Sequence, residues 1–217
     1  MVRIGIIAEG KSEWLVFEEI IRTLRADVEF QRIRPDITLQ SGSPFGWNGV
    51  KAWCRQNGSK LDAILRGVTS HPLHLLVVHL DCSMAHNEHA LRACPPASDT
   101  ADALRAVILA WLGLAACPPF LIITAPSRCT EAWVVSALGA PPYKKLANVE
   151  CEDDVEEELA RRKLLPRKDG EVKKPESRYL PLAQQTAARL TVVRHHCTQA
   201  ERFCQDFVAA VAGLPGV

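Results

Sequence analysis

The sequence predicts an α/β fold in which a mostly parallel sheet is flanked by helices, with a helical extension at the C-terminal end. Three short apolar runs, at residues 4–7, 74–80 and 120–124, have the near-continuous hydrophobicity of strands that are covered on both faces. Segments of helical periodicity separate these runs, and this alternation favours a doubly wound sheet with right-handed crossovers. From residue 126 onwards the pattern is helical and rich in charge.

The first predicted strand stops at an acidic residue. Residues 4–7 are followed by Glu9-Gly10, where the glycine allows a sharp turn into a helix. This helix is expected to run through Arg25 with Ser12 as its N-cap. Its apolar face consists of Trp14, Phe17, Ile21 and Leu24. Because ligands of open α/β sheets bind outside the carboxyl ends of the strands, Glu9 occupies a position suited to chemistry.

The next segment is predicted to contain short elements around a surface loop. A strand is expected at residues 37–39, and turn-forming residues follow at 41–49. Trp47 lies in this loop, where it either anchors the loop to the core, stacks on a base or closes over a site. Helices are predicted from Val50 to Gln56 and from Leu61 to Arg66.

The second strong strand, from His74 to Asp81, also ends on an acid. If the two strands are neighbours in a parallel sheet, Glu9 and Asp81 meet at the same edge, as a hard divalent cation requires. The alternative is that Asp81 only caps the segment that follows.

Residues 85–96 are predicted to form a loop or lid, and a helix is expected from Asp99 to Leu114, capped by Ser98 or Asp99. The third strand follows from Phe120 to Thr124. We therefore expect an α/β core at residues 1–125 and a helical extension, packed on it, at residues 126–217.

The extension is predicted to begin with a helix that carries Glu131 in its first turn. An acidic run at residues 150–158 and a basic run at 161–174 come next. Pairs such as Glu157 with Arg161 have the i,i+4 spacing of a solvated helix with its own ion pairs, as do Glu158 and Arg162. The basic run is also suited to a phosphate backbone. Two amphipathic helices are expected at 182–190 and 198–211.

Composition bounds the class of protein. With 47% hydrophobic and 24% charged residues, the chain has the composition of an ordinary globular protein. Its net charge of +1 neither requires nor excludes a polyanionic partner. The longest apolar runs are too short for a membrane helix, and a strand pattern at the N-terminus in place of a signal segment predicts a cytoplasmic protein. The eight scattered cysteines, with no Cys-x-x-Cys pair, are expected to be reduced thiols.

A phosphate-loop pattern is also present, because Gly5 to Ser12 satisfies Gly-x-x-x-x-Gly-Lys-Ser. It would make the protein a nucleotide hydrolase. Against it, only four residues precede Gly5, and Ile6 and Ile7 have the character of a strand interior. If Gly5 lies inside the strand, the match is accidental.

The same residues resemble the Toprim family, the metal-binding core of topoisomerases, bacterial primases and the overcoming-lysogenisation-defect nucleases. That family places Glu-Gly after its first strand, here Glu9-Gly10, and Asp-x-Asp after a later one, here Asp81-Cys82-Ser83, which lacks the second acid. The segments Glu131 to Val134 and Tyr179 to Ala183 are similar to segments of small stand-alone Toprim-like proteins.

The resemblance implies cleavage of phosphodiester bonds in DNA or RNA with Mg²⁺ or Mn²⁺. It implies metal ligation by Glu9 and Asp81, with Ser83 as a neutral ligand, and catalytic roles for Glu9 and Asp81. Glu131 is the candidate for the compensating acid, or else a helix cap. Phosphate contacts are expected from Gly10, Lys11 and Arg128.

Other classes stay open. His79, Asp81, His86 and His89 have ligand chemistry that suits zinc, without any zinc hydrolase signature, and His195-His196 is similarly unspecific. Because the second acid is missing, a binding module that recognises nucleic acid or a partner ATPase, as in bacterial defence systems, is the main alternative to an enzyme. No membrane partner is expected, and a homodimer is left open.

Overall fold

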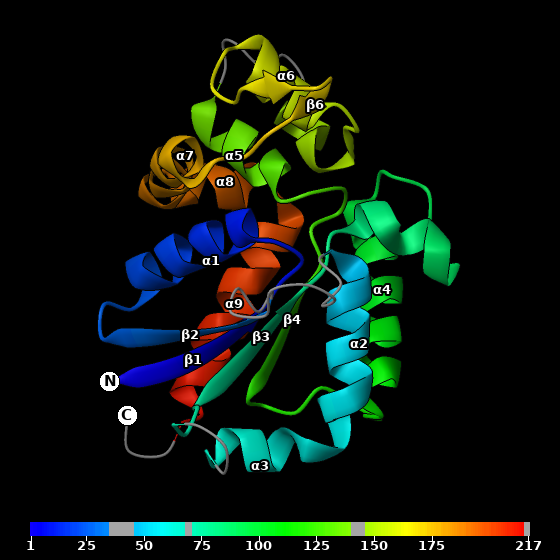
Figure 1. Cartoon of the computed structure of the whole chain (residues 1–217), viewed down its shortest axis with the longest axis vertical. Helices are drawn as coiled ribbons and strands as arrows, with labels where there is room; N and C mark the ends of the chain where they lie inside the picture. Colours follow the sequence, from blue (N-terminus) through cyan, green and yellow to red (C-terminus); the bar gives the residue numbers. More distant parts are fainter. Residues whose placement is uncertain (35–45, 68–70, 140–145, 215–217) are drawn as a thin grey trace.

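The centre of the molecule is a four-stranded parallel sheet (Figure 1). The computed structural model describes residues 1–34, 46–67, 71–139 and 146–214. Its strands are β1 (Val2–Ile7), β2 (Val28–Arg34), β3 (Leu75–His79) and β4 (Leu121–Thr124), in the spatial order β2-β1-β3-β4. Ile4 of β1 is aligned with Leu75 of β3, and Ile7 with Val78. The predicted α/β class with a parallel sheet is therefore confirmed.

Helices cover both faces of this sheet (Figure 1). The helices are α1 (Lys11–Leu24), α2 (Trp47–Asn57), α3 (Leu61–Leu65), α4 (Ala97–Leu112), α5 (Glu131–Leu138), α6 (Val155–Arg161), α7 (Glu176–Ala188), α8 (Leu190–His196) and α9 (Thr198–Ala212). Shorter 3₁₀ segments are η1 (Gly58–Lys60), η2 (Cys82–Glu88) and η3 (Leu146–Cys151), and β5 (Arg167–Lys168) pairs with β6 (Glu171–Val172) in a small antiparallel hairpin.

Each face of the sheet has its own apolar core, because successive strand side chains point to opposite sides. One core joins Ile4, Ile6 and Val77 to α1, α5, α7, α8 and α9. The other joins Val78 and Ile123 to α2 and α4. All of these strand residues are buried, as the near-continuous apolar runs predict.

An aromatic cluster ties the extension to the sheet. The ring of Phe17 in α1 lies 5.6 Å from the ring of Trp133 in α5 and 5.1 Å from the ring of Phe203 in α9, measured between centroids. Both contacts are edge-on, the geometry that aromatic pairs prefer. Residues beyond 125 thus share one continuous core with the sheet.

The structure corrects several local expectations. The first helix begins at Lys11 with Gly10 as its N-cap, and the Ser12 hydroxyl donates to Glu13 Oε1 (2.8 Å), so the predicted Ser12 cap is wrong. Residues 28–34 form the edge strand β2, which the sequence pattern did not reveal, whereas the strand expected at 37–39 lies outside the described residues. Trp47 is the first residue of α2 and packs against the core under that helix.

Further differences concern cysteines and charge. Cys94 and Cys151 form a disulfide, contrary to the expectation of eight reduced thiols, and the other six cysteines are free. In α6, Glu158 pairs with Arg162 as predicted, but Glu157 pairs with Arg167 of the β5–β6 hairpin instead of Arg161. Within the described ranges, no helix has the length and hydropathy needed to cross a membrane.

Candidate functional site

Glu9 and Asp81 come together at the carboxyl ends of the neighbouring strands β1 and β3. The backbone N–H of Asp81 donates to Glu9 Oε1 at 2.6 Å. The strand register explains this contact, because Ile7 and Val78 are aligned and each acid lies two residues beyond the end of its strand. Two of the residues predicted from sequence therefore face one another across one sheet edge, where α/β sheets bind ligands.

Asp81 is held in place by buried partners. Its Oδ1 accepts hydrogen bonds from the backbone N–H (3.1 Å) and the hydroxyl (3.1 Å) of Thr130, the residue before α5. His79 Nε2 lies 3.0 Å from the same oxygen. Burial lowers the pKa of His79, but the charge and hydrogen bond of Asp81 outweigh this effect, so the net shift is upward. Asp81 Oδ2 makes no hydrogen bond to another described residue.

The Glu9 carboxyl is strongly perturbed. Burial raises its pKa to about 8, and the negative charge of Asp81 adds to this shift, while His79 opposes it. With its pKa raised to about 8, the Glu9 carboxyl holds a proton near neutral pH. The two carboxylates form a strained electrostatic arrangement that added positive charge would relieve.

Glu131 lies nearby in a different setting. It is completely buried, and its Oε1 accepts a hydrogen bond from the Tyr179 hydroxyl (2.7 Å) and pairs with Lys174 Nζ (2.6 Å). Lys174 also pairs with Glu156 Oε1 (2.7 Å). Burial acts to raise the pKa of Glu131, but the Lys174 charge prevails and lowers it. The acid predicted to compensate for the missing ligand is thus itself neutralised by a partly buried lysine.

Glu13 is under the electrostatic influence of both Asp81 and the Glu131–Lys174 pair. It is buried on α1, one turn after Glu9, and burial raises its pKa, as do the charges of Asp81 and Glu131, whereas Lys174 acts in the opposite direction. A side chain at Gly10 would place its Cβ 2.7 Å from Glu13 Oε2, so the glycine leaves room for this acid. Glu13 was not singled out from the sequence, although an acid on the apolar face of the first helix is a signal that could have found it.

The remaining predicted residues lie around this edge. Lys11 is exposed in the first turn of α1. Arg128 is partly exposed and pairs with Asp153 (3.1 Å), and its carbonyl accepts from the backbone N–H of Ser83 (3.0 Å). The Ser83 residue is exposed at the start of η2.

The competing motifs fit the structure less well. Gly5 lies inside β1, aligned with both Gln31 and Leu76, so Gly5 to Ser12 does not have the loop geometry of a phosphate loop. His86 and His89 are exposed, and only His79 contacts Asp81. In the part of the chain that the structure describes, no group of three or more His, Cys, Asp or Glu side chains is placed to hold a metal ion.

Comparison with known proteins gives no relative: no family model, no curated protein and no solved structure matches the chain.

Proposed function

We propose that Glu9 and Asp81 bind a Mg²⁺ or Mn²⁺ ion and that the protein cleaves phosphodiester bonds of nucleic acid, as its resemblance to the Toprim family implies. The observation that carries this proposal is the position of the Glu9 carboxylate at the ends of β1 and β3: it accepts a 2.6 Å hydrogen bond from the backbone N–H of Asp81, and the Asp81 charge is near enough to raise the pKa of Glu9. Placing two acids in a site that is largely removed from water costs stability, and a bound cation would offset this cost.

The donor set suits such an ion. Mg²⁺ is typically held by one or two carboxylates and keeps several waters, so two acids are sufficient ligands. Each acid has one oxygen, Glu9 Oε2 and Asp81 Oδ2, with no hydrogen bond to another described residue. When bound, the ion would supply Lewis-acid stabilisation of the charge that develops on a phosphate.

The protein's own residues have distinct parts in this proposal. Thr130 and His79 orient Asp81, so they act as positioning residues. Without an ion, the pKa of Glu9 is raised to about 8, so this carboxyl is suited to exchange a proton near neutral pH, and a bound cation would favour its charged form. Lys11 and Arg128, at the rim, are suited to contact backbone phosphates on either side of the cleaved bond.

A second candidate is a module that binds nucleic acid or a partner ATPase without cleaving. One observation favours it: Glu131 Oε1 is held by Lys174 and Tyr179, and its Oε2 is buried without a hydrogen-bond partner, so the charge that a third acid would bring to a two-metal centre is already neutralised by a lysine. Exposed Ser83 adds no charge to replace it.

Calorimetric titration with Mg²⁺ and Mn²⁺ tests cation binding, using wild type, Glu9→Gln and, as a matched control on the exposed hairpin, Glu171→Gln. Binding that is lost only in Glu9→Gln supports the proposal. A nicking assay on plasmid and a cleavage assay on single-stranded RNA with the same proteins then separate the two candidates. Equal cation binding by wild type and Glu9→Gln would refute the site.

A further inference from the structure

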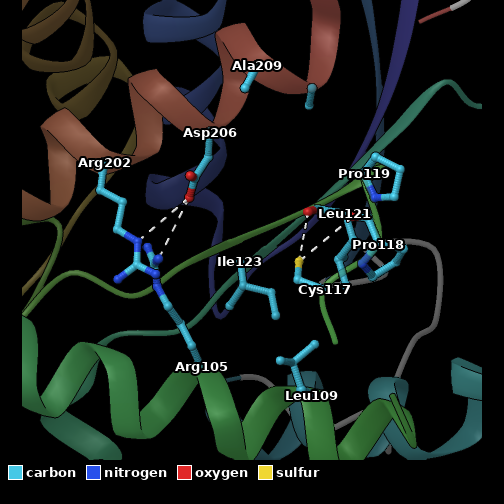
Figure 2. Close-up of a pocket in the computed structure, with 11 residues that line it drawn as sticks. Arg105, Leu109, Cys117, Pro118, Pro119, Leu121, Ile123, Arg202, Asp206 and Ala209 are labelled. Atoms are coloured by element: carbon cyan, nitrogen blue, oxygen red, sulfur yellow. Dashed lines mark hydrogen bonds and ion pairs between the residues drawn. The ribbon is translucent and has the colours of Figure 1, made fainter. Parts of the chain in front are cut away.

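A pocket lies beside the edge strand β4, between α4, α9 and the residues that lead into β4 (Figure 2). It is a pocket of about 360 Å³, within the range of small-molecule sites. Its walls are apolar, formed by Leu109, Pro118, Pro119, Leu121 and Ile123. It belongs to the amino-terminal approach to β4, whereas Glu9 and Asp81 follow the carboxyl ends of β1 and β3.

The polar end of this pocket is an arginine with unused donors. Arg105 of α4 is 7% exposed, and its guanidinium makes no hydrogen bond to any described residue. Its Nε and Nη2 are buried without a partner, and its Nη1 lies 3.7 Å from Asp206 Oδ2. Figure 2 shows the guanidinium directed from α4 across the pocket toward α9. A buried guanidinium left in this state is costly, and a ligand that accepts hydrogen bonds from it would reduce the cost.

Neighbouring charges define the kind of ligand. Arg202 Nε lies 3.9 Å from Asp206 Oδ2, and Arg202 also pairs with Asp102. Arg202 therefore has two acidic partners, Asp102 and Asp206, whereas Arg105 has only the 3.7 Å contact with Asp206 among the described residues. Burial lowers the pKa of Arg105 to about 10, with the Arg202 charge adding to the effect, so the guanidinium is still charged at neutral pH. Two arginines and two aspartates balance at this end of the pocket, so the attraction for an anion comes from the unpaired donors of Arg105, and Asp206 opposes a dianion more than a monoanion.

We propose that this pocket binds a small amphipathic monocarboxylate, with the carboxylate on Arg105 and the apolar body against the Leu109, Leu121 and Ile123 walls. Guanidinium and carboxylate match as two parallel N–H···O bonds, which gives specificity for a planar anion. The carboxylate supplies acceptors that the described residues do not.

Octanoate is the probe, titrated calorimetrically into the full chain, with octanol, octylamine and octyl phosphate as comparisons. We expect octanoate to bind at least about tenfold more tightly than the other three, and Arg105→Met to weaken it by about 10- to 100-fold, the loss of a charge-assisted hydrogen bond. Arg194→Met, a change of an exposed arginine on α8, should leave the affinity unaltered.

A second variant tests the pocket independently, in case Arg105→Met does not fold. Ala209 lines the pocket mouth from α9 and is exposed, so Ala209→Trp should block octanoate while the thermal unfolding midpoint stays near that of wild type. Absence of octanoate binding, equal binding of octanol, tighter binding of octyl phosphate, or unchanged affinity in both variants would each overturn the proposal.

Discussion

Removing the Lys174 ammonium should strongly destabilise the protein. In Lys174→Met the fully buried Glu131 carboxylate would lose its 2.6 Å ion pair and keep only the Tyr179 hydroxyl, while Glu13 would lose the positive charge that opposes its raised pKa. Breaking a buried ion pair by removing one partner costs about 3–5 kcal/mol, because the other charge stays buried and uncompensated. Lys174 retains 21% exposure, so we expect the lower part of this range, about 3 kcal/mol. This is a large share of the roughly 5–15 kcal/mol that stabilises a typical domain.

Urea unfolding of wild type and Lys174→Met measures this loss. Lys173→Met is the matched control, because Lys173 is 44% exposed and pairs only with the exposed Glu171 of the hairpin, so little change is expected. The double variant Lys174→Met/Glu131→Leu should recover part of the stability, since it removes both charges. Equal unfolding midpoints for the Lys174 and Lys173 variants would refute the conclusion that Lys174 neutralises the acidic interior.

Three further predictions follow from single contacts. Gly5→Ala should cost about 1–3 kcal/mol in urea unfolding, because its Cβ would lie 2.7 Å from a methyl carbon of Ile33 and 2.8 Å from one each of Leu73 and Leu76, so three packed side chains would have to move; an unchanged midpoint would contradict this packing. Thr130→Val should weaken Mn²⁺ binding by about 10- to 100-fold through loss of the hydroxyl that orients Asp81, and Thr130→Ser should restore it in the same calorimetric titration. Alkylation of the chain, unfolded without reductant, should label the six free cysteines, and Cys94→Ser should lower the unfolding free energy by about 2–4 kcal/mol; labelling of all eight would argue against the disulfide.

The part of the fold that follows from simple periodicity was predictable from sequence. The central strands β1 and β3 are buried on both faces, so their residues form apolar runs that stand out from the rest of the chain. The meeting of Glu9 and Asp81 followed from the rule that carboxyl ends of neighbouring parallel strands share an edge. The edge strand β2 was missed because it is only half-buried and interrupts its apolar residues with Glu29, Gln31 and Arg32.

The rest of the site depends on contacts between distant segments. Lys174 belongs to a basic run that has the pattern of a solvated surface, and only the folded chain directs it to Glu131 and Glu156. Thr130 acts partly through its backbone N–H, which no residue pattern reveals. Arg105 lies on a helix whose amphipathic stripe was clear, but the pocket that it faces is closed by α9, far along the chain.

The most direct test of the proposed metal site is to locate the ion itself. Anomalous diffraction from crystals soaked in Mn²⁺ should show one peak between the Glu9 and Asp81 carboxylates, about 2.2 Å from an oxygen of each, as expected for Mn²⁺ with hard oxygen ligands. The peak should be missing in crystals of Glu9→Gln. A peak elsewhere, or no peak in wild type at a concentration that saturates calorimetric binding, would contradict the account.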